Sequence, residues 1–270
     1  MTLLNTSLIR KTTLFLVVMI LSVSAIAANF DQMQRLANQG FTEAQAGLGA
    51  MYFQGKGVHQ DYSKAASWFE KAANQGDDNA QSLLGLMYYD GKGVRQDYVK
   101  AASWLEKAAN QGNAGAQAAL GGMYYDGEGV RQDYSKAVQW YEKAASQGHA
   151  GAQNLLGGMY YLGEGVRQDY SKAVSWLEKA ANQGNTHAQG MLGEMYYDGK
   201  GVRQDYSKAV SWLEKAANQG NANAQGMLGA MYYAGRGVRQ NYAVAKEWFG
   251  KSCDNGNQNG CDAYRTLNKR

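Results

Sequence analysis

The apolar positions of residues 113–148 follow a helical period twice, with a glycine-rich break between the two stretches. Ala116, Leu120 and Met123 recur at spacings of three or four residues, as on one face of a helix. The break is the Gly-Glu-Gly of residues 127–129. The second periodic stretch contains Tyr134, Ala137, Val138, Trp140, Tyr141, Ala144 and Ala145. The pattern predicts two antiparallel helices joined by a turn.

The same pattern occurs six times with a period of 36 residues. The units are residues 41–76, 77–112, 113–148, 149–184, 185–220 and 221–256. Half units flank them at residues 28–40 and 257–270, and their more polar sequences suit the ends of a stack. All six tryptophans share one position: Trp68, Trp104, Trp140, Trp176, Trp212 and Trp248. A fixed period predicts a repeat array, in which stacking of neighbours supplies the core. We expect the tryptophans to mark its buried seam.

Several polar and glycine residues match helix-end positions of this repeat. Asn113 and Asp133 are predicted to cap the first and second helices, because a short side-chain oxygen accepts from a free amide. Gly127 and Gly148 fit left-handed positions that follow a helix. Gly121 lies inside a helix, where glycine costs up to about 1 kcal/mol relative to alanine. A close approach of a neighbouring helix would account for it.

The first 27 residues have the pattern of an export signal. Arg10 and Lys11 precede an apolar run at residues 14–23, and Ala-Ile-Ala ends at Ala27, where we expect cleavage. The apolar run is too short for a membrane span, which needs roughly 20 residues, and no other stretch is long enough. The mature chain is therefore predicted to be periplasmic or secreted.

Net charge and short motifs exclude several function classes. The formal charge is +4, and loss of Arg10 and Lys11 with the leader leaves about +2, without any long basic run. This argues against nucleic-acid binding, which needs an extended basic surface. The three histidines fall at unrelated repeat positions, and the loop at residues 126–130 lacks the ligand spacing of calcium or phosphate loops. We expect no metal and no cofactor.

The repeat carries a recognisable motif. It reads Ala-Gln-x-x-Leu-Gly-x-Met-Tyr, then Gly-x-Gly-Val-x-Gln-Asp-Tyr, then Lys-Ala-x-x-Trp-x-x-Lys-Ala-Ala-x-x-Gly. This resembles the Sel-one-like repeat (SLR) family, a relative of the tetratricopeptide repeat, over essentially all of residues 29–270. The resemblance implies an all-α, right-handed superhelical α/α solenoid whose first helices line the concave side. It also implies a protein-binding adaptor.

The two cysteines occupy the last unit. Repeat position puts Cys253 near the end of a second helix and Cys261 near the start of the next first helix, facing each other across a short turn. A disulfide there would close a short loop and cost the unfolded chain roughly 2 to 3 kcal/mol in conformational entropy. A redox-active pair is the alternative, although such pairs are usually Cys-x-x-Cys. Residues 251–261 also resemble the Helicobacter cysteine-rich branch of the family, in which every repeat carries a bridge.

That branch raises the possibility of penicillin binding or β-lactamase activity. Serine acyl enzymes use Ser-x-x-Lys with Ser-Asp-Asn and Lys-Thr-Gly elements, and none of these occurs here. The recurrent pair Ser175 and Lys179 is spaced by four residues, and a solvated helix face explains it better. We therefore predict no catalytic residues and no enzymatic activity.

An aromatic ladder on the first helices is the candidate partner-binding surface. It consists of Phe53, Tyr89, Tyr125, Tyr161, Tyr197 and Tyr233. Nearby positions vary between the copies and include Leu86 and Glu194. Small residues flanking tyrosines would form a shallow groove suited to a protein or peptide segment. The alternative is that these tyrosines only pack between adjacent first helices.

A second ladder lies in the loops: Arg95, Arg131, Arg167, Arg203 and Arg239. These arginines could meet an anionic partner such as a cell-wall polymer. The competing interpretation is that they satisfy loop carbonyls and nearby aspartates such as Asp97 and Asp133. Taken together, the sequence predicts an exported adaptor for an unidentified protein or peptide, with peptidoglycan or glycan binding as the alternative.

Overall fold

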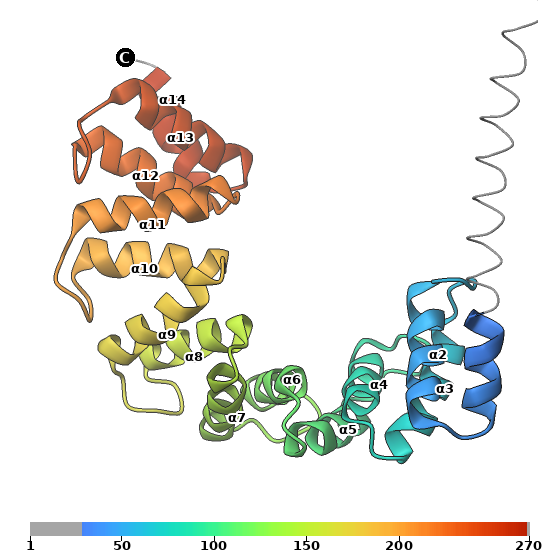
Figure 1. The fold of residues 1–270 in the computed structure, drawn as a ribbon. Helices are drawn as coiled ribbons and strands as arrows, with labels where there is room; N and C mark the ends of the chain where they lie inside the picture. Colours follow the sequence, from blue (N-terminus) through green and yellow to red (C-terminus); the bar gives the residue numbers. More distant parts are fainter. Residues whose placement is uncertain (1–28, 269–270) are drawn as a thin grey trace, which may run out of the picture. The chain divides into compact units, whose positions relative to one another are not determined.

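The computed structural model describes residues 29–268, and every regular element in that range is a helix (Figure 1). Residues 29–38 are helical. The first helices of the repeats are Thr42–Gln54 (α2), Asp78–Asp90 (α4), Ala114–Asp126 (α6), Ala150–Leu162 (α8), Thr186–Asp198 (α10) and Ala222–Ala234 (α12). The second helices are Tyr62–Asn74 (α3), Tyr98–Asn110 (α5), Tyr134–Ser146 (α7), Tyr170–Asn182 (α9), Tyr206–Asn218 (α11) and Tyr242–Asp254 (α13), and Gln258–Asn268 (α14) follows. The predicted signal peptide lies outside the described residues.

The chain divides into two compact units. The first extends through Ala116 and includes Glu128–Val130, and the second comprises Gln117–Gly127 and the chain from Arg131 onward. Within each unit, a first helix packs against the second helix of its own repeat, which in turn packs against the next first helix. In the second unit, α8 to α14 follow one another in chain order (Figure 1). The predicted all-α helix-turn-helix repeat is confirmed.

The helix ends follow the predicted local chemistry. Asn113 Oδ1 accepts from the Ala116 amide at 2.9 Å, and Asp133 Oδ1 accepts from the Lys136 amide at 3.0 Å. Gly127 has a φ of 77°, a left-handed conformation that glycine adopts without steric cost. These contacts satisfy backbone groups that a helix end leaves unpaired, so each turn is specified locally.

Close packing explains the glycine inside each first helix. A Cβ atom added at Gly121 would lie 2.8 Å from Cδ1 of Tyr141 on α7, and one at Gly157 would lie 2.7 Å from Cγ of Leu177 on α9. Any larger residue would push the two helices of the pair apart. The predicted close approach is confirmed, and it allows buried leucines such as Leu156 to fill the interior.

A buried glutamine on each first helix joins neighbouring repeats. Gln153 Nε2 donates to the Ala145 carbonyl at 3.0 Å, and Gln153 Oε1 accepts from Gln183 Nε2 at 2.8 Å. Gln183 Nε2 also donates to the Gly148 carbonyl at 3.0 Å. Because a buried amide is costly unless it is hydrogen-bonded, this network favours one register between successive helix pairs.

The tryptophans are not buried, contrary to the prediction of a buried seam. Each one is half-buried, and a lysine three residues later lies over its ring. The Lys179 ammonium lies 3.9 Å from the centroid of the Trp176 ring. The side chains that fill the seam are the leucine, tyrosine or phenylalanine next to each tryptophan, such as Leu177. A cation over an indole face is favourable even at an exposed position.

A disulfide joins Cys253 on α13 to Cys261 on α14, with 4.4 Å between the Cα atoms. The repeat positions of the two cysteines predict this pairing. The bond ties the last helix of the array to the preceding helix pair. It therefore reinforces the end of the stack, where no further repeat follows within the described residues.

Candidate functional site

The aromatic ladder is half-buried, and its rings lie against the second helix of the same repeat. The Tyr125 ring centroid is 5.1 Å from that of Tyr134, and Tyr161 and Tyr170 are 5.2 Å apart. Phe53 makes the equivalent contact with Tyr62 at 5.3 Å. The rings thus fill the space between the two helices of a repeat, and only part of each remains available to a partner.

The ladder hydroxyls reach into the glycine loop of the next repeat. Tyr125 donates to Glu164 Oε2 at 2.8 Å, and Lys200 Nζ donates to the Tyr161 hydroxyl at 2.9 Å. The same relationship recurs at two further pairs, Tyr89 with Glu128 and Tyr197 with Arg236. The partner is always the middle residue of the Gly-x-Gly loop. These partners were not identified from the sequence. The signal that could have found them is the change of charge at this loop position between the copies.

These contacts perturb ionisation. The hydrogen bond to Glu164, aided by burial, raises the pKa of Tyr125 to about 12. Hydrogen bonds to Tyr161 and then to Asp198 raise the pKa of Lys200 above its usual value. The charged loop residue therefore accepts a hydrogen bond from the tyrosine in some repeats and donates one to it in others. The hydroxyl donates where the loop residue is acidic and accepts where it is basic.

The two variable residues of the predicted surface remain accessible. Leu86 on α4 is 39% exposed. Glu194 on α10 is also exposed. Partial burial is the main cause that raises the pKa of its carboxyl. The charge of Asp198 adds to this shift, and the charge of Lys200 opposes it. Leu86 belongs to the first unit and Glu194 to the second.

Two hollows lie side by side on the first-helix face of the second unit, and they share Ala230 and Phe249. The first, of about 390 Å³, is the Glu194 hollow, lined by Glu194, Asn223, Gly226, Met227, Ala230, Phe249, Asn257, Asn259 and Gly260. The second, of about 380 Å³, is the Tyr233 hollow, lined by Tyr197, Ala230, Tyr233, Ala234, Arg236, Phe249, Ala263, Thr266 and Leu267. Both combine predicted surface residues with side chains from α14, whose contribution the repeat pattern does not reveal.

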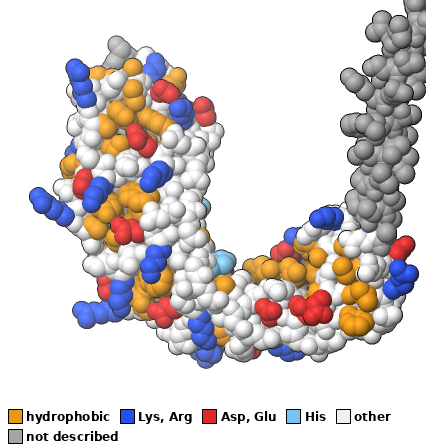
Figure 2. Space-filling view, in the orientation of Figure 1, with side chains coloured by type: hydrophobic (Ala, Val, Ile, Leu, Met, Phe, Trp, Pro, Cys, Tyr) orange, Lys and Arg blue, Asp and Glu red, His pale blue; other side chains and the backbone are white. Residues whose placement is uncertain are grey.

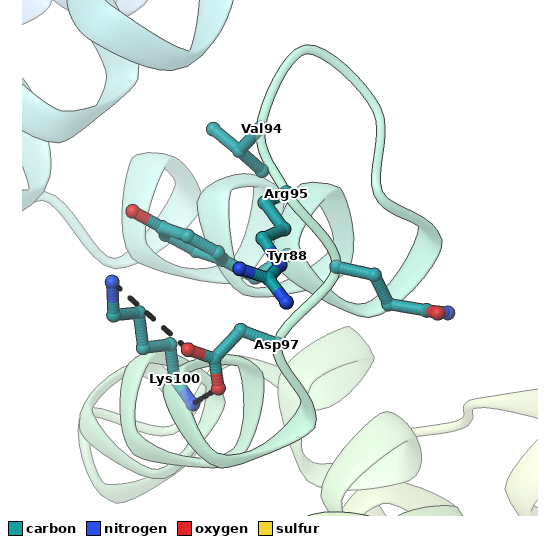
Figure 3. A pocket seen from close by; sticks show the side chains of 6 residues that line it. Tyr88, Val94, Arg95, Asp97 and Lys100 are labelled. Carbon is teal, nitrogen blue, oxygen red and sulfur yellow. Dashed lines mark hydrogen bonds and ion pairs between the residues drawn. The ribbon is translucent and has the colours of Figure 1, made fainter.

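The loop arginines do not pair with the nearby aspartates, contrary to the interpretation that they serve to satisfy loop carbonyls and aspartates. Asp97 instead accepts from the Lys100 amide at 3.0 Å as the cap of α5, and its carboxylate lies 4.0 Å from Lys100 Nζ. Arg95 is exposed, and within residues 29–268 none of the five ladder arginines forms a hydrogen bond or ion pair. Figure 3 shows Arg95 with Tyr88, Asp97 and Lys100 around a hollow of about 600 Å³.

Metal ligation, membrane spans and the role of a histidine were the remaining features to locate among the described residues. No three His, Cys, Asp or Glu side chains in this part of the chain converge as metal ligands would. Among the described helices, none has both the length and the apolar character needed to cross a membrane. His149 caps α8, where its Nδ1 accepts from the Ala152 amide at 3.1 Å. Figure 2 shows acidic and basic side chains interspersed with hydrophobic ones over the visible face.

Comparison with known proteins identifies the repeat. The Sel1 repeat model matches residues 42–77, 78–113, 114–149, 150–185, 186–221 and 222–257. Each match begins one residue later than the predicted unit. No curated protein matches the chain.

Two solved structures resemble most of the chain. A protective antigen from uropathogenic Escherichia coli strains, which displays an SLR fold, is 38% identical over 91% of this chain, with a TM-score of 0.87. The match covers 52% of the antigen, so this chain spans about half its length. A Sel1 repeat protein from Oxalobacter formigenes is 34% identical over 83% of this chain and 99% of its own, with a TM-score of 0.72. Helicobacter pylori cysteine rich protein B matches 48% of this chain and 94% of its own at 29% identity, with a TM-score of 0.40.

Proposed function

The chain belongs to the Sel1 repeat family, and from this premise we propose that it is an exported, non-enzymatic adaptor that binds a protein or peptide segment on its first-helix face. Sel1 repeats form protein-interaction scaffolds, which gives the general class of function. The finer assignment depends on where the copies differ. Repetition preserves packing, whereas a binding site needs side chains that distinguish one part of the surface from another.

The two hollows on the second unit are the observation that carries the proposal. Small residues, Gly226 and Ala230, and aromatic side chains, Tyr197 and Phe249, are among the residues that line them. Aromatic walls offer large contact areas at low cost in conformational entropy. Adjacent hollows of this kind suit successive side chains of one peptide segment.

A site-specific crosslinking experiment tests the assignment. Ala230 lines both hollows and is exposed, so a photoreactive phenylalanine derivative introduced there should crosslink a discrete partner in the native host. The same derivative at Ser211, an exposed residue on the second helix α11, is the matched control. Equal crosslinking at both positions, or none at Ala230, would count against the first-helix face.

Substitutions in the aromatic ladder provide a second test. Tyr197→Ala and Tyr233→Ala should weaken partner capture, because they remove wall area of the Tyr233 hollow. The corresponding Phe variants keep the ring and separate lost contact area from a lost hydroxyl. Unchanged capture by folded Ala variants would exclude this ladder as the contact surface.

Export is the second part of the proposal. The predicted leader and the disulfide between Cys253 and Cys261 support it, since disulfides persist in oxidising compartments. The expected result in a bacterial host is recovery in the osmotic-shock or culture fraction with an N-terminus at Ala28. Recovery of the uncleaved chain from cytoplasm would oppose it.

The loop arginines favour one alternative, binding of an anionic cell-wall glycan. The hollow beside Arg95 combines Tyr88 with two cationic side chains, and the arginine recurs in five repeats. Retention on insoluble peptidoglycan that falls in an Arg95→Ala, Arg131→Ala, Arg167→Ala variant would support this alternative. Release of muropeptides or hydrolysis of nitrocefin would instead indicate an enzyme.

A further inference from the structure

Glu194 departs from the rest of the repeat array. The equivalent residues in the other copies are Ala50, Leu86, Gly122, Gly158 and Ala230. Glu194 is therefore the only charged residue at this position of the first helix. Within residues 29–268, its side chain forms no hydrogen bond or ion pair, and the charges that act on it are those of Asp198 and Lys200.

Both polar and apolar side chains line the hollow beside Glu194. Its polar lining, in addition to Glu194, consists of Asn223, Asn257 and Asn259. Asn223 Oδ1 on α12 accepts from Nδ2 of Asn257, the residue before α14, at 2.9 Å, which holds the two amides together. Met227 and Phe249 are the large apolar side chains of the lining.

We propose that the Glu194 hollow receives a lysine or arginine side chain from the peptide partner. This inference rests on the proposed peptide-binding function and adds the chemistry of the bound segment. The methylene stem of the basic residue would lie along Met227 and Phe249 while its cationic end meets the Glu194 carboxylate. Basic side chains commonly bury their stems and keep the charge at a polar rim.

Electrostatics favours a cation over the other occupants of such a hollow. An acidic side chain would be repelled by Glu194, which lines the hollow, whereas Asp198 does not line it and is paired with Lys200 at 3.1 Å. A neutral apolar side chain would bury a carboxylate without a partner, which is costly. A cation restores the interactions that partial burial removes from the Glu194 carboxylate. A charge-assisted hydrogen bond to it is stronger than a neutral one.

The adjacent Tyr233 hollow extends the same recognition. Its walls include Tyr233, Phe249 and Leu267, and it shares Phe249 and Ala230 with the Glu194 hollow. One segment could therefore place a basic side chain in the first hollow and an apolar side chain in the second. The occupant is a peptide with both kinds of residue, as opposed to a free cation.

Four peptide pools test the proposal with the full mature chain. The pools contain acetylated, amidated nonapeptides with randomised flanks and a fixed central residue, which is lysine, arginine, norleucine or glutamate. Norleucine keeps the stem of lysine but lacks its charge. We expect the lysine and arginine pools to bind about fivefold to tenfold more tightly than the norleucine pool, from one partly exposed charge-assisted contact.

Variants of Glu194 then identify the recognising group. Glu194→Gln should abolish the preference, and Glu194→Lys should shift it toward the glutamate pool. Glu43→Gln is the control, because Glu43 is an exposed carboxylate on a first helix of the other unit. Circular dichroism establishes that each variant is folded.

The possible outcomes separate this inference from the proposed function. Equal binding by the four pools, or a preference that survives Glu194→Gln, would overturn the basic-residue inference and leave peptide binding intact. Failure of every pool to bind would overturn both. Preference for lysine and arginine that disappears in Glu194→Gln and reverses in Glu194→Lys would establish the assignment.

Discussion

The hydroxyl of Tyr125 donates a 2.8 Å hydrogen bond to the carboxylate of Glu164, which lies 39 positions later in the glycine loop of the next repeat. The ring of the same tyrosine packs against Tyr134 of its own repeat. One side chain thus joins two helices and the following loop. Neighbouring repeats of the second unit are held by a polar contact as well as by their apolar core.

Loss of that hydroxyl should weaken the second unit in a pH-dependent way. We expect Tyr125→Phe to lower the free energy of unfolding by about 1 kcal/mol near neutral pH, the usual size for a partly exposed hydrogen bond to a charge. The pKa of Tyr125 is raised from 10.0 to about 12. The folded state therefore holds the proton where the unfolded state releases it, so this stabilisation is complete below about pH 10 and is lost toward pH 12.

Urea unfolding at pH 8 and pH 11.5 measures the effect, with ultraviolet titration to follow tyrosine ionisation. Tyr161→Phe is the control, since its hydroxyl accepts from Lys200 and has no acidic partner. A Tyr125→Phe difference that stays constant between the two pH values would contradict the assigned hydrogen bond.

Two adjacent glycines on α8 should respond oppositely to alanine. Gly157→Ala would place a Cβ atom 2.7 Å from Leu177 Cγ, so we expect a loss of about 1 to 3 kcal/mol from overpacking. An added Cβ at Gly158 meets nothing within 4 Å. Gly158→Ala should therefore stabilise the helix by up to about 1 kcal/mol through its better propensity. Thermal unfolding of the pair measures both shifts, and equal effects would contradict the packing argument.

Removal of the disulfide should loosen the end of the array selectively. A Cys253→Ser, Cys261→Ser variant loses the constraint between α13 and α14, worth roughly 2 to 3 kcal/mol on the chain-entropy model. Amide hydrogen exchange should accelerate in residues 242–268, because stability in a repeat array is largely local. Residues 42–110 provide the internal control, and uniform acceleration throughout the chain would argue against an end staple.

Glu194 should reduce stability at neutral pH. Its pKa is raised mainly by burial, so the folded state binds the proton more tightly than the unfolded state does. The resulting stabilisation exists at low pH and disappears as pH rises through the folded-state pKa. Glu194→Gln should therefore be more stable than the parent at pH 7, by less than about 1 kcal/mol after allowance for solvent screening.

The difference between Glu194→Gln and the parent should vanish toward about pH 3, where the carboxyl is largely protonated in both states. Thermal unfolding at the two pH values tests this, with Glu43→Gln as the exposed control. A variant less stable than the parent at pH 7 would show that Glu194 serves the fold and would remove one reason to assign it to binding.

The sequence alone determined the helix pair, its turns and its ends, because these depend on neighbouring residues. Asn113 and Asp133 cap helices through contacts three positions away, and Gly127 supplies a left-handed backbone at the turn. Six copies of the same local signals make the secondary structure predictable. Repeat position also brought Cys253 and Cys261 together, since only a short turn separates them.

Only the tertiary structure decided which side chains share a surface. The bond between Tyr125 and Glu164 joins residues from successive repeats, and a period of 36 residues does not indicate where a hydroxyl points. The Glu194 hollow likewise requires α10, α12 and α14 to meet. The tryptophans lie half-exposed because the orientation of packed helices, and not hydrophobicity alone, determines which face of a ring reaches solvent.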